Sequence, residues 1–294
     1  MKPALRFKST SAFTIFSCFA ISVAVSSCSK DVNGSTQQTY LSIPSVSREA
    51  EASLGSLTAS AGIDSSAVVA WYNFNGGSLR DKSLYRNNIT FSNATPATDR
   101  NGVPGNAYYF GGSSYMSVPN SASLSPTHGI TLFAVVKVSG FYEGKCHGNR
   151  ILSKGINSSI NGVYYMDFSD AYVTNQMSCS IDTVDKQHEN FSAAYGNFNT
   201  GRFIAEGDTL ANVQTEHWYH LVFTYANGVA SYYTDGKLTQ RGTGTVAFTA
   251  NGDDLIIGAL NNPQYPYNLV GTIDQIGIFN KALNENQVAR LSDF

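Results

Sequence analysis

The clearest strand pattern along the chain lies between Trp218 and Thr239, where apolar and aromatic runs broken by polar turns predict three consecutive β-strands. Runs rich in aromatic and β-branched residues are separated there by Asn227-Gly228 and by Asp235-Gly236. Both dipeptides favour a positive φ at two successive residues, which the two-residue loops of type I′ hairpins require. The stretch therefore predicts an antiparallel meander.

Counting back from the first of these turns gives the strand register. It places Phe223 opposite Tyr232 and Val222 opposite Tyr233. Aromatic and β-branched pairs of this kind stabilise a sheet by roughly 0.2–1 kcal/mol each. Residues 218–225 carry large side chains on both faces, so we expect this strand to be covered on both sides.

Short apolar runs elsewhere predict further strands. They lie at Val68–Phe74, Ala107–Phe110, Tyr115–Val118, Ile130–Val138, Arg150–Lys154, Val163–Phe168, Asp254–Gly258 and Val270–Phe279. Residues 172–215 are polar and loop-rich, and no regular element is predicted there. Near the C-terminus, Asn284 is a candidate N-cap for a short helix over Glu285–Leu291, with apolar Val288 and Leu291 three positions apart.

The N-terminus has the pattern of an export signal. Basic residues precede an apolar run over residues 12–25, which is too short and too rich in Ser and Thr for a membrane span. The run ends in Val25-Ser26-Ser27-Cys28, which resembles a bacterial lipobox, and Ser29-Lys30-Asp31 resembles a Bacteroidetes surface-export tag. We therefore expect residues 1–27 to be a lipoprotein signal peptide and Cys28 to carry lipid at the cell-surface side of the outer membrane. An ordinary signal peptide with a chance cysteine is the alternative.

The next segment, residues 28–66, is rich in Ser, Thr and Ala and has few aromatic residues. We interpret it as a flexible tether between the lipid and a folded domain at residues 67–294. A weak helix over Ser47–Ala61, packed as a small cap on that domain, is the alternative.

Composition supports a β-rich domain and argues against one class of partner. Charged residues make up 14% of the chain and aromatic residues 12%, and there are 26 glycines, which suits many short strands joined by turns. The formal net charge is -2 and the sequence has no basic stripe, so we expect no nucleic-acid partner.

Several segments together resemble one family. They are WYNFNGG, YYFGGSSYMSVPNSASL, ILSKG, HWYHLVFTY, YTDGKL, LIIGAL and GTIDQIGIFNKALNENQVARL. In this order they resemble the laminin-G-like jelly roll of the concanavalin A-like lectin/glucanase superfamily, over residues 67–294. The resemblance implies an all-β fold, a two-sheet antiparallel jelly-roll sandwich with one concave sheet. It does not imply a substrate, because the fold hosts lectins, glycanases and interaction modules. The chain departs from the family in a long insert between Phe168 and Glu216.

The resemblance also implies a structural Ca²⁺ between the opening and closing strands. The matching positions are Asn73 and Asp274, whose oxygen atoms suit calcium. The alternative is that both side chains only bond the backbone at a strand edge.

Candidate catalytic residues are few. Glycanases of this superfamily carry Glu-x-Asp-x-Glu on a concave strand, where period two aims the carboxylates at one face. The nearest segment, Glu206-Gly207-Asp208, lacks the last glutamate and is interpreted as a charged turn. His217 and His220 are three apart, which on a strand places them on opposite faces and argues against zinc.

Two thiols remain in the exported domain once Cys18 leaves with the signal and Cys28 takes lipid. We expect a disulfide between Cys146 and Cys179. A zinc site that adds His147 and His188 is the alternative, although an adjacent Cys-His pair is poor chelate geometry.

Aromatic side chains in predicted loops are the candidates for contact with a ligand. Tyr142, Tyr172, Tyr195 and Tyr265 lie in the insert and its neighbouring loops, where they could stack on sugar rings. We therefore predict a non-catalytic surface lipoprotein that binds a glycan or glycoprotein. A glycoside hydrolase or lyase with an unrecognised carboxylate pair, and a protein-docking module without a sugar site, are the alternatives.

Overall fold

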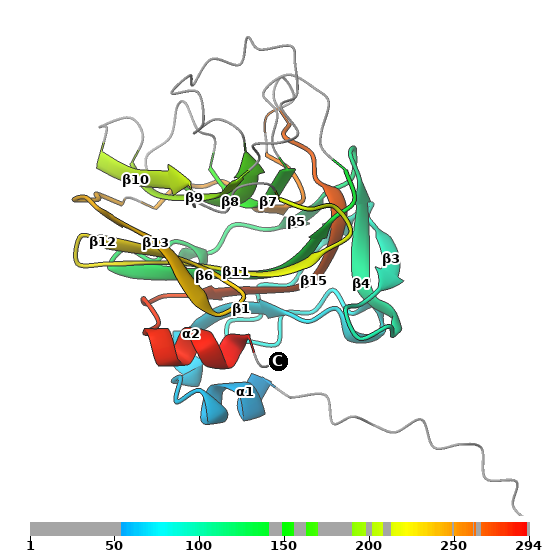
Figure 1. The fold of residues 1–294 in the computed structure, drawn as a ribbon, viewed down its shortest axis with the longest axis horizontal. Helices are drawn as coiled ribbons and strands as arrows, with labels where there is room; N and C mark the ends of the chain where they lie inside the picture. Colours follow the sequence, from blue (N-terminus) through cyan, green and yellow to red (C-terminus); the bar gives the residue numbers. More distant parts are fainter. Residues whose placement is uncertain are drawn as a thin grey trace, which may run out of the picture. The chain divides into compact units, whose positions relative to one another are not determined.

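A computed structural model gives the fold. It describes residues 54–140, 149–155, 163–169, 190–197, 202–207, 213–248, 250–260, 262 and 266–292. Within them the chain forms two antiparallel sheets packed face to face, with two short α-helices beside one sheet (Figure 1). The predicted all-β, two-sheet sandwich is confirmed. No helix in this part of the chain is long and apolar enough to cross a membrane.

The first sheet, sheet A, has the strand order β13-β12-β11-β6-β15-β4-β3, and β1 also pairs with β15. Its strands are β1 Val68–Tyr72, β3 Thr95–Thr98, β4 Pro104–Gly111, β6 Gly129–Val138, β11 Trp218–Ala226, β12 Val229–Thr234, β13 Lys237–Thr243 and β15 Val270–Phe279. Strands β4 and β1 pair with different parts of the same edge of β15. Ile273 pairs with Tyr108 on β4, and Ile276 pairs with Tyr72 on β1.

The second sheet, sheet B, has the order β10-β9-β8-β7-β14-β5-β2. Its strands are β2 Phe91–Ser92, β5 Met116–Val118, β7 Asn149–Lys154, β8 Val163–Ser169, β9 Asn190–Asn197, β10 Arg202–Gly207 and β14 Leu255–Ile257. Strands β9 and β10 fall inside residues 172–215, where the sequence predicted no element. Small residues separate the two aromatics of β9, Phe191 and Tyr195, and this weakens its apolar pattern.

The central meander has the predicted register. Phe223 lies opposite Tyr232, and Val222 lies opposite Tyr233. Asn227 and Gly228 have φ values of 51° and 82°, and Asp235 and Gly236 have 50° and 75°. Positive φ at both central residues is the geometry that type I′ turns require, so the turn chemistry sets the pairing.

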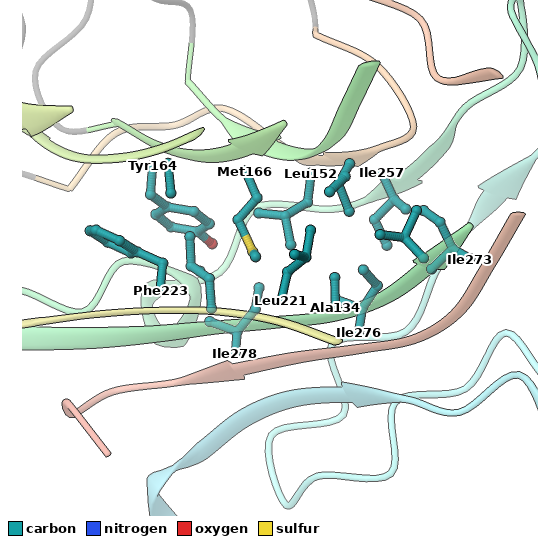
Figure 2. Packing of buried hydrophobic residues seen from close by; sticks show 14 of the residues in the cluster. Ala134, Leu152, Tyr164, Met166, Leu221, Phe223, Ile257, Ile273, Ile276 and Ile278 are labelled. Carbon is teal, nitrogen blue, oxygen red and sulfur yellow. The ribbon is translucent and has the colours of Figure 1, made fainter. Parts of the chain in front are cut away.

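The main core lies between the two sheets. Figure 2 shows Leu152, Tyr164 and Met166 of sheet B pointing toward Leu221 and Ile278 of sheet A. All five side chains are 0% exposed. Truncation of a buried leucine or isoleucine to alanine typically costs about 2–5 kcal/mol, so these contacts hold the two sheets together.

Two short helices cover the outer face of sheet A. Helix α1 spans Leu54–Ser60 and α2 spans Glu285–Leu291. Their apolar residues join a second cluster around Trp71, whose ring stacks on Phe133 with centroids 5.4 Å apart. Leu57 on α1 is 2% exposed. Helix α1 lies within residues 28–66, the range that the sequence assigned to a tether, and it overlaps the Ser47–Ala61 segment of the helical-cap alternative.

The predicted C-terminal helix is confirmed. Asn284 accepts from the backbone N–H of Gln287, whose side chain accepts from the Asn284 N–H. Val288 and Leu291 are buried. Short 3-10 turns occur at η1 Ser65–Ala67, η2 Asn75–Gly77 and η3 Ala122–Leu124.

The polar loop after β1 is held by a buried carboxylate. Asp81 is 0% exposed. Its oxygens accept from the backbone N–H groups of Trp71, Ser83 and Asn87 at 2.9, 2.8 and 2.7 Å. The Ser83 hydroxyl donates to it as well. These bonds tie the loop to the opening strand.

Candidate functional site

Sheet B has one face in the core and one face turned away from it. On β8, Tyr164, Met166 and Phe168 belong to the core, so the alternate residues Tyr165 and Asp167 lie on the outer face. The register extends this face across the sheet. One row contains Phe91 on β2, Ser117 on β5, Ile256 on β14, Ser153 on β7 and Tyr165 on β8.

A buried polar cluster lies near one end of this face. It consists of Arg150, Tyr165, Asp167, Ser192 and Tyr267, and we call it the Arg150 cluster. Arg150 Nη2 is 3.3 Å from Asp167 Oδ2, and Ser192 donates to Asp167 Oδ1. The Arg150 guanidinium carbon is 3.9 Å from the ring centroid of Tyr165 and 5.2 Å from that of Tyr267. The two charges therefore compensate each other between aromatic rings.

The guanidinium of Arg150 keeps unused donors. Nε and Nη1 are buried and have no hydrogen-bond partner among the described residues. A buried donor without a partner costs about 1–3 kcal/mol, so the cluster favours any oxygen that can reach it. Arg150 is only 1% exposed, however, and the neighbouring Ser153 hydroxyl donates to the Ala259 carbonyl at 2.9 Å. Because Arg150 is almost fully buried, a group as large as a sugar ring does not reach this guanidinium.

The backbone near Tyr267 is strained. Tyr267 has a φ of 46°, a left-handed conformation that is rare for a large side chain. Its carbonyl accepts from the backbone N–H of Arg150 at 2.9 Å. The side chain of Asn149 binds both the Val270 N–H and the Gly140 carbonyl. These bonds fix the segment that carries Tyr267 beside β7.

The accessible aromatic residues of this face lie at the opposite edge of sheet B. Phe91 on β2 and Tyr115, directly before β5, have ring centroids 4.9 Å apart at an angle of 33°. We call this pair the aromatic platform. Phe91 is 44% exposed and Tyr115 is 37% exposed. Tyr115 shares the outer face because Met116, the next residue, points into the core.

Polar groups border the aromatic platform. The Asn93 side-chain oxygen accepts from the Tyr115 N–H at 2.7 Å, and the Asn93 N–H donates to the Tyr115 carbonyl at 3.3 Å. The Tyr115 hydroxyl and the Asn93 Nδ2 make no hydrogen bond within the described residues. The arrangement therefore offers an apolar ring surface beside two free polar groups.

The predicted ligand-binding tyrosines are not brought together by the described residues. Tyr195 is a correction: it lies on β9, is 1% exposed, and donates through its hydroxyl to the Pro126 carbonyl at 2.8 Å. Its ring stacks on Phe248 in the core, so it is not a loop aromatic. Tyr142, Tyr172 and Tyr265 lie outside the described residues and remain predictions.

The positions predicted to hold calcium differ in how they fit a cation. Asn73 fits, because its Oδ1 is buried and has no donor in the part of the chain that the structure describes. Asp274 fits less well, because Arg100 Nη1 donates to its Oδ2 at 2.8 Å and the Arg100 N–H donates at 3.2 Å. Burial raises the pKa of Asp274 while the Arg100 charge opposes that change. A calcium ion at this carboxylate would compete with a protein cation.

The structure places some of the residues that were considered as catalytic or zinc-binding candidates. Glu206 and Gly207 end β10, and Asp208 lies outside the described residues. His217 precedes β11 and packs its ring against Tyr219, while His220 lies on β11. Burial, with a smaller effect of the Arg100 charge, lowers the pKa of His220. No group of three His, Cys, Asp or Glu that could hold a metal occurs among the described residues.

One buried lysine has an unusual environment. Lys154, at the end of β7, is 0% exposed, and its Nζ donates to Asn120 Oδ1 at 2.8 Å and to the Asp253 carbonyl. Burial lowers its pKa to about 8. The ammonium group of Lys154 donates to protein oxygens of Asn120 and Asp253. We therefore infer that Lys154 links β7 to the segment before β14.

The predicted modifications fall outside the described residues. Cys28, Cys146 and Cys179 are not placed by the structure. Their lipidation and pairing stay predictions.

The comparisons with known proteins decide the family. A model described as the concanavalin A-like lectin/glucanases superfamily matches residues 110–289. The chain belongs to this superfamily. No curated protein sequence matches it. Sheets A and B are therefore the two sheets of a concanavalin A-like sandwich.

Solved structures share this concanavalin A-like fold at low sequence identity. Domain 4 of AbnA, an extracellular GH43 arabinanase from Geobacillus stearothermophilus solved with arabinotriose, is 19% identical with a TM-score of 0.50. The alignment covers 76% of this chain and 98% of that one. The binding domain of Paraclostridial Mosquitocidal Protein 1 is 14% identical with a TM-score of 0.53, over 78% of this chain and 52% of that one. The receptor-binding domain of botulinum neurotoxin D is 13% identical with a TM-score of 0.54, over 78% and 53%. At these identities the likeness shows the fold alone.

Proposed function

We propose that this concanavalin A-like domain binds a glycan, or the glycan of a glycoprotein, without cleaving it. The aromatic platform carries the proposal, because it is the exposed pair of contacting rings on the outer face of sheet B. A sugar ring has an apolar C–H face and a polar rim. Phe91 and Tyr115 supply the matching apolar surface, and the Tyr115 hydroxyl and Asn93 amide lie where sugar hydroxyls would follow.

The similar structures support the class of ligand. Domain 4 of AbnA, which this chain matches over nearly all of that domain's length, was solved in complex with arabinotriose. That complex makes arabinotriose a rational first probe. We expect binding in the micromolar to millimolar range, because an open surface buries little area and must replace the hydration of the sugar.

A non-catalytic function is favoured by the carboxylates of this face. Glycoside hydrolysis uses two carboxyl groups, about 5–10 Å apart, on either side of the scissile bond. Asp167 is the carboxylate that the Arg150 cluster contains, and it is already held by Arg150 and Ser192. A group that is buried and paired in this way is poorly placed to act as acid or nucleophile.

The location of the domain completes the proposal. The lipobox-like residues before Cys28 and the Lys30-Asp31 pair support a protein anchored by lipid at the outer-membrane surface. Two or three acyl chains give stable anchoring where one chain would not. A tethered domain at that location would hold extracellular glycans near the cell.

Titration calorimetry with arabinotriose, guided by a glycan array on the soluble domain, tests the function. Phe91→Ala and Tyr115→Ala should each weaken binding about tenfold or more, which corresponds to about 1.4 kcal/mol. Tyr85→Ala is the matched control, since Tyr85 is a 42% exposed aromatic outside this face. Chromatography of the same mixtures must show intact sugars. Shortened products would identify an enzyme, and a blank array would favour a protein-docking module.

A further inference from the structure

A groove of about 460 Å³ lies on the outer face of sheet A, on the opposite sheet from the aromatic platform. Strands β11, β12 and β13 form its floor, and residues 282–286, which lead into α2, form one wall. Its volume lies within the range of about 300–1,000 Å³ that small-molecule sites occupy. Helix α2 covers the neighbouring part of this face, so the groove is the place where that cover ends.

The floor of the groove presents hydroxyl groups without partners. Thr224 and Ser231 lie directly opposite each other on β11 and β12, and they are 4% and 6% exposed. Neither side chain makes a hydrogen bond within the described residues, and neither hydroxyl is among the fully buried polar atoms that lack a partner, so both oxygens are open to the groove. Two adjacent hydroxyls that are open to a groove can each donate to, or accept from, a polar occupant. Tyr233, 3% exposed, extends the floor toward α2.

The rim of the groove carries one charge of each sign. Arg241 lies opposite Ser231 in the sheet register, and its guanidinium pairs with the Glu285 carboxylate. Their side chains are 53% and 61% exposed. An exposed pair of this kind contributes little to stability, with a median of about 0–1 kcal/mol. The pair therefore presents a donor and an acceptor at the groove with no net charge.

We infer that this groove is a second binding site, for a neutral saccharide unit. The cancelling charges give no preference for an anion or a cation, and the floor combines hydroxyl groups with the apolar side chains of Ala226 and Val229. A sugar matches both parts, because its hydroxyls can donate to Glu285, accept from Arg241, and do either with Thr224 and Ser231. The ligand class rests on the proposed function, whereas the residues are different from those of the aromatic platform.

Backbone amide NMR of the soluble domain tests this site separately from the platform. In the Phe91→Ala/Tyr115→Ala double variant, arabinotriose and neutral di- and trisaccharides of glucose, galactose and mannose are titrated in turn. We expect at least one sugar to shift the amides of Thr224, Ser231 and Arg241. Arg241→Ala and Glu285→Ala should each weaken that response about tenfold, and both residues are exposed enough to be replaced without unfolding.

The second variant fills the groove with a larger side chain. Ser231→Phe should abolish the shifts at Thr224 and Arg241, with its fold checked by the dispersion of the remaining amides. Glu216→Gln is the control, because it breaks another ion pair of sheet A, with Lys137 at 3.1 Å, outside the groove. Shifts at the platform of the wild-type protein without any at the groove would overturn this site alone. No response at either site would overturn the proposed function as well.

Discussion

Arg100 donates a hydrogen bond from Nη1 to Oδ2 of Asp274 over 2.8 Å, at the position where the family resemblance implies a calcium ligand. Arg100 is thus a protein cation at the carboxylate where a calcium ion is expected. Asn73 Oδ1, the other expected calcium ligand, is buried and has no donor among the described residues. Calcium binding here would require Arg100 to release the carboxylate.

This competition makes the calcium site testable. We predict that calcium raises the melting temperature more in Arg100→Gln than in the wild-type protein, because the substitution frees Asp274. A ligand held only by the folded state stabilises by about 2.7 kcal/mol at a hundredfold excess over Kd. Thermal melts with chelator and with added calcium measure the effect. If neither protein responds, calcium has no structural role near Asn73 and Asp274.

Stability should depend on the buried carboxylate of Asp81. Asp81→Ala leaves the N–H groups of Trp71, Ser83 and Asn87 without their acceptor. Since hydrogen bonds to charged groups contribute about 1.5–3 kcal/mol each, we expect the free energy of unfolding to fall by about 3 kcal/mol or more. Urea denaturation measures the change. Asp64→Ala is the control: its exposed carboxylate accepts one backbone N–H, of Ser66, and its loss should matter far less.

The lowered pKa of Lys154 predicts that the free energy of unfolding rises in mild alkali. Its pKa is about 8 in the folded protein, against the ordinary value of 10.5 in the unfolded chain. Between these pH values the unfolded state binds more protons, so the free energy of unfolding increases as the pH rises. Denaturation at pH 7.5, 8.5 and 9.5 should show the increase in the wild-type protein and not in Lys154→Met.

The trend should reverse in stronger alkali. Burial raises the pKa of the Tyr164 and Tyr195 hydroxyls. The folded state therefore retains protons that the unfolded chain loses near pH 10, and stability falls above that pH. A continued rise past pH 10 would contradict these assignments.

The pairing of Cys146 with Cys179 has a direct chemical test. Closing a loop of this length contributes on the order of 3–4 kcal/mol in the chain-entropy model. Thiol titration of the unreduced, denatured domain should find no free cysteine, and reduction should lower the melting temperature. Two reactive thiols without reductant would rule out the bridge and leave the zinc alternative, which a chelator would then reveal.

Lipid attachment at Cys28 is tested in cells. Cys28→Ala should move the protein from the membrane fraction to the soluble fraction, because the proposed anchor is acyl chains and not a protein span. Detergent partitioning measures the change. A variant that still partitions with detergent would show another means of attachment.

The sequence predicted most of the fold because its strongest signals are local. Asn227-Gly228 fixes the pairing of Phe223 with Tyr232, and the capping residue Asn284 fixes the start of α2. Tyr195 was misplaced although it alternates with Phe191 and Ala193, a period-two pattern that indicates a half-buried strand. The small residues between the aromatics concealed it in a polar insert.

The candidate site was harder to predict because it depends on distant pairs. Phe91 and Tyr115 meet across strands that are separated by β3 and β4 in the chain, and Phe91 lies in none of the family-like segments. The sequence signal at Phe91 is weak. It consists of a short run with one aromatic residue beside several Asn residues. Likewise, nothing local to Arg150 indicates that Asp167 neutralises it on the next strand.

The pairing of β1 with β15 means that the first strand of sheet A cannot pair until the last strand is available. Val68 lies opposite Phe279, so the opening strand finds its neighbour only in the final part of the chain. During synthesis the N-terminal end emerges first, and β1 then has an unpaired edge until the last strand arrives. Contacts so distant in sequence slow folding and leave apolar surface open to association with other chains. A chaperone that shields this edge, or folding delayed until the whole chain is available, would protect the growing sandwich.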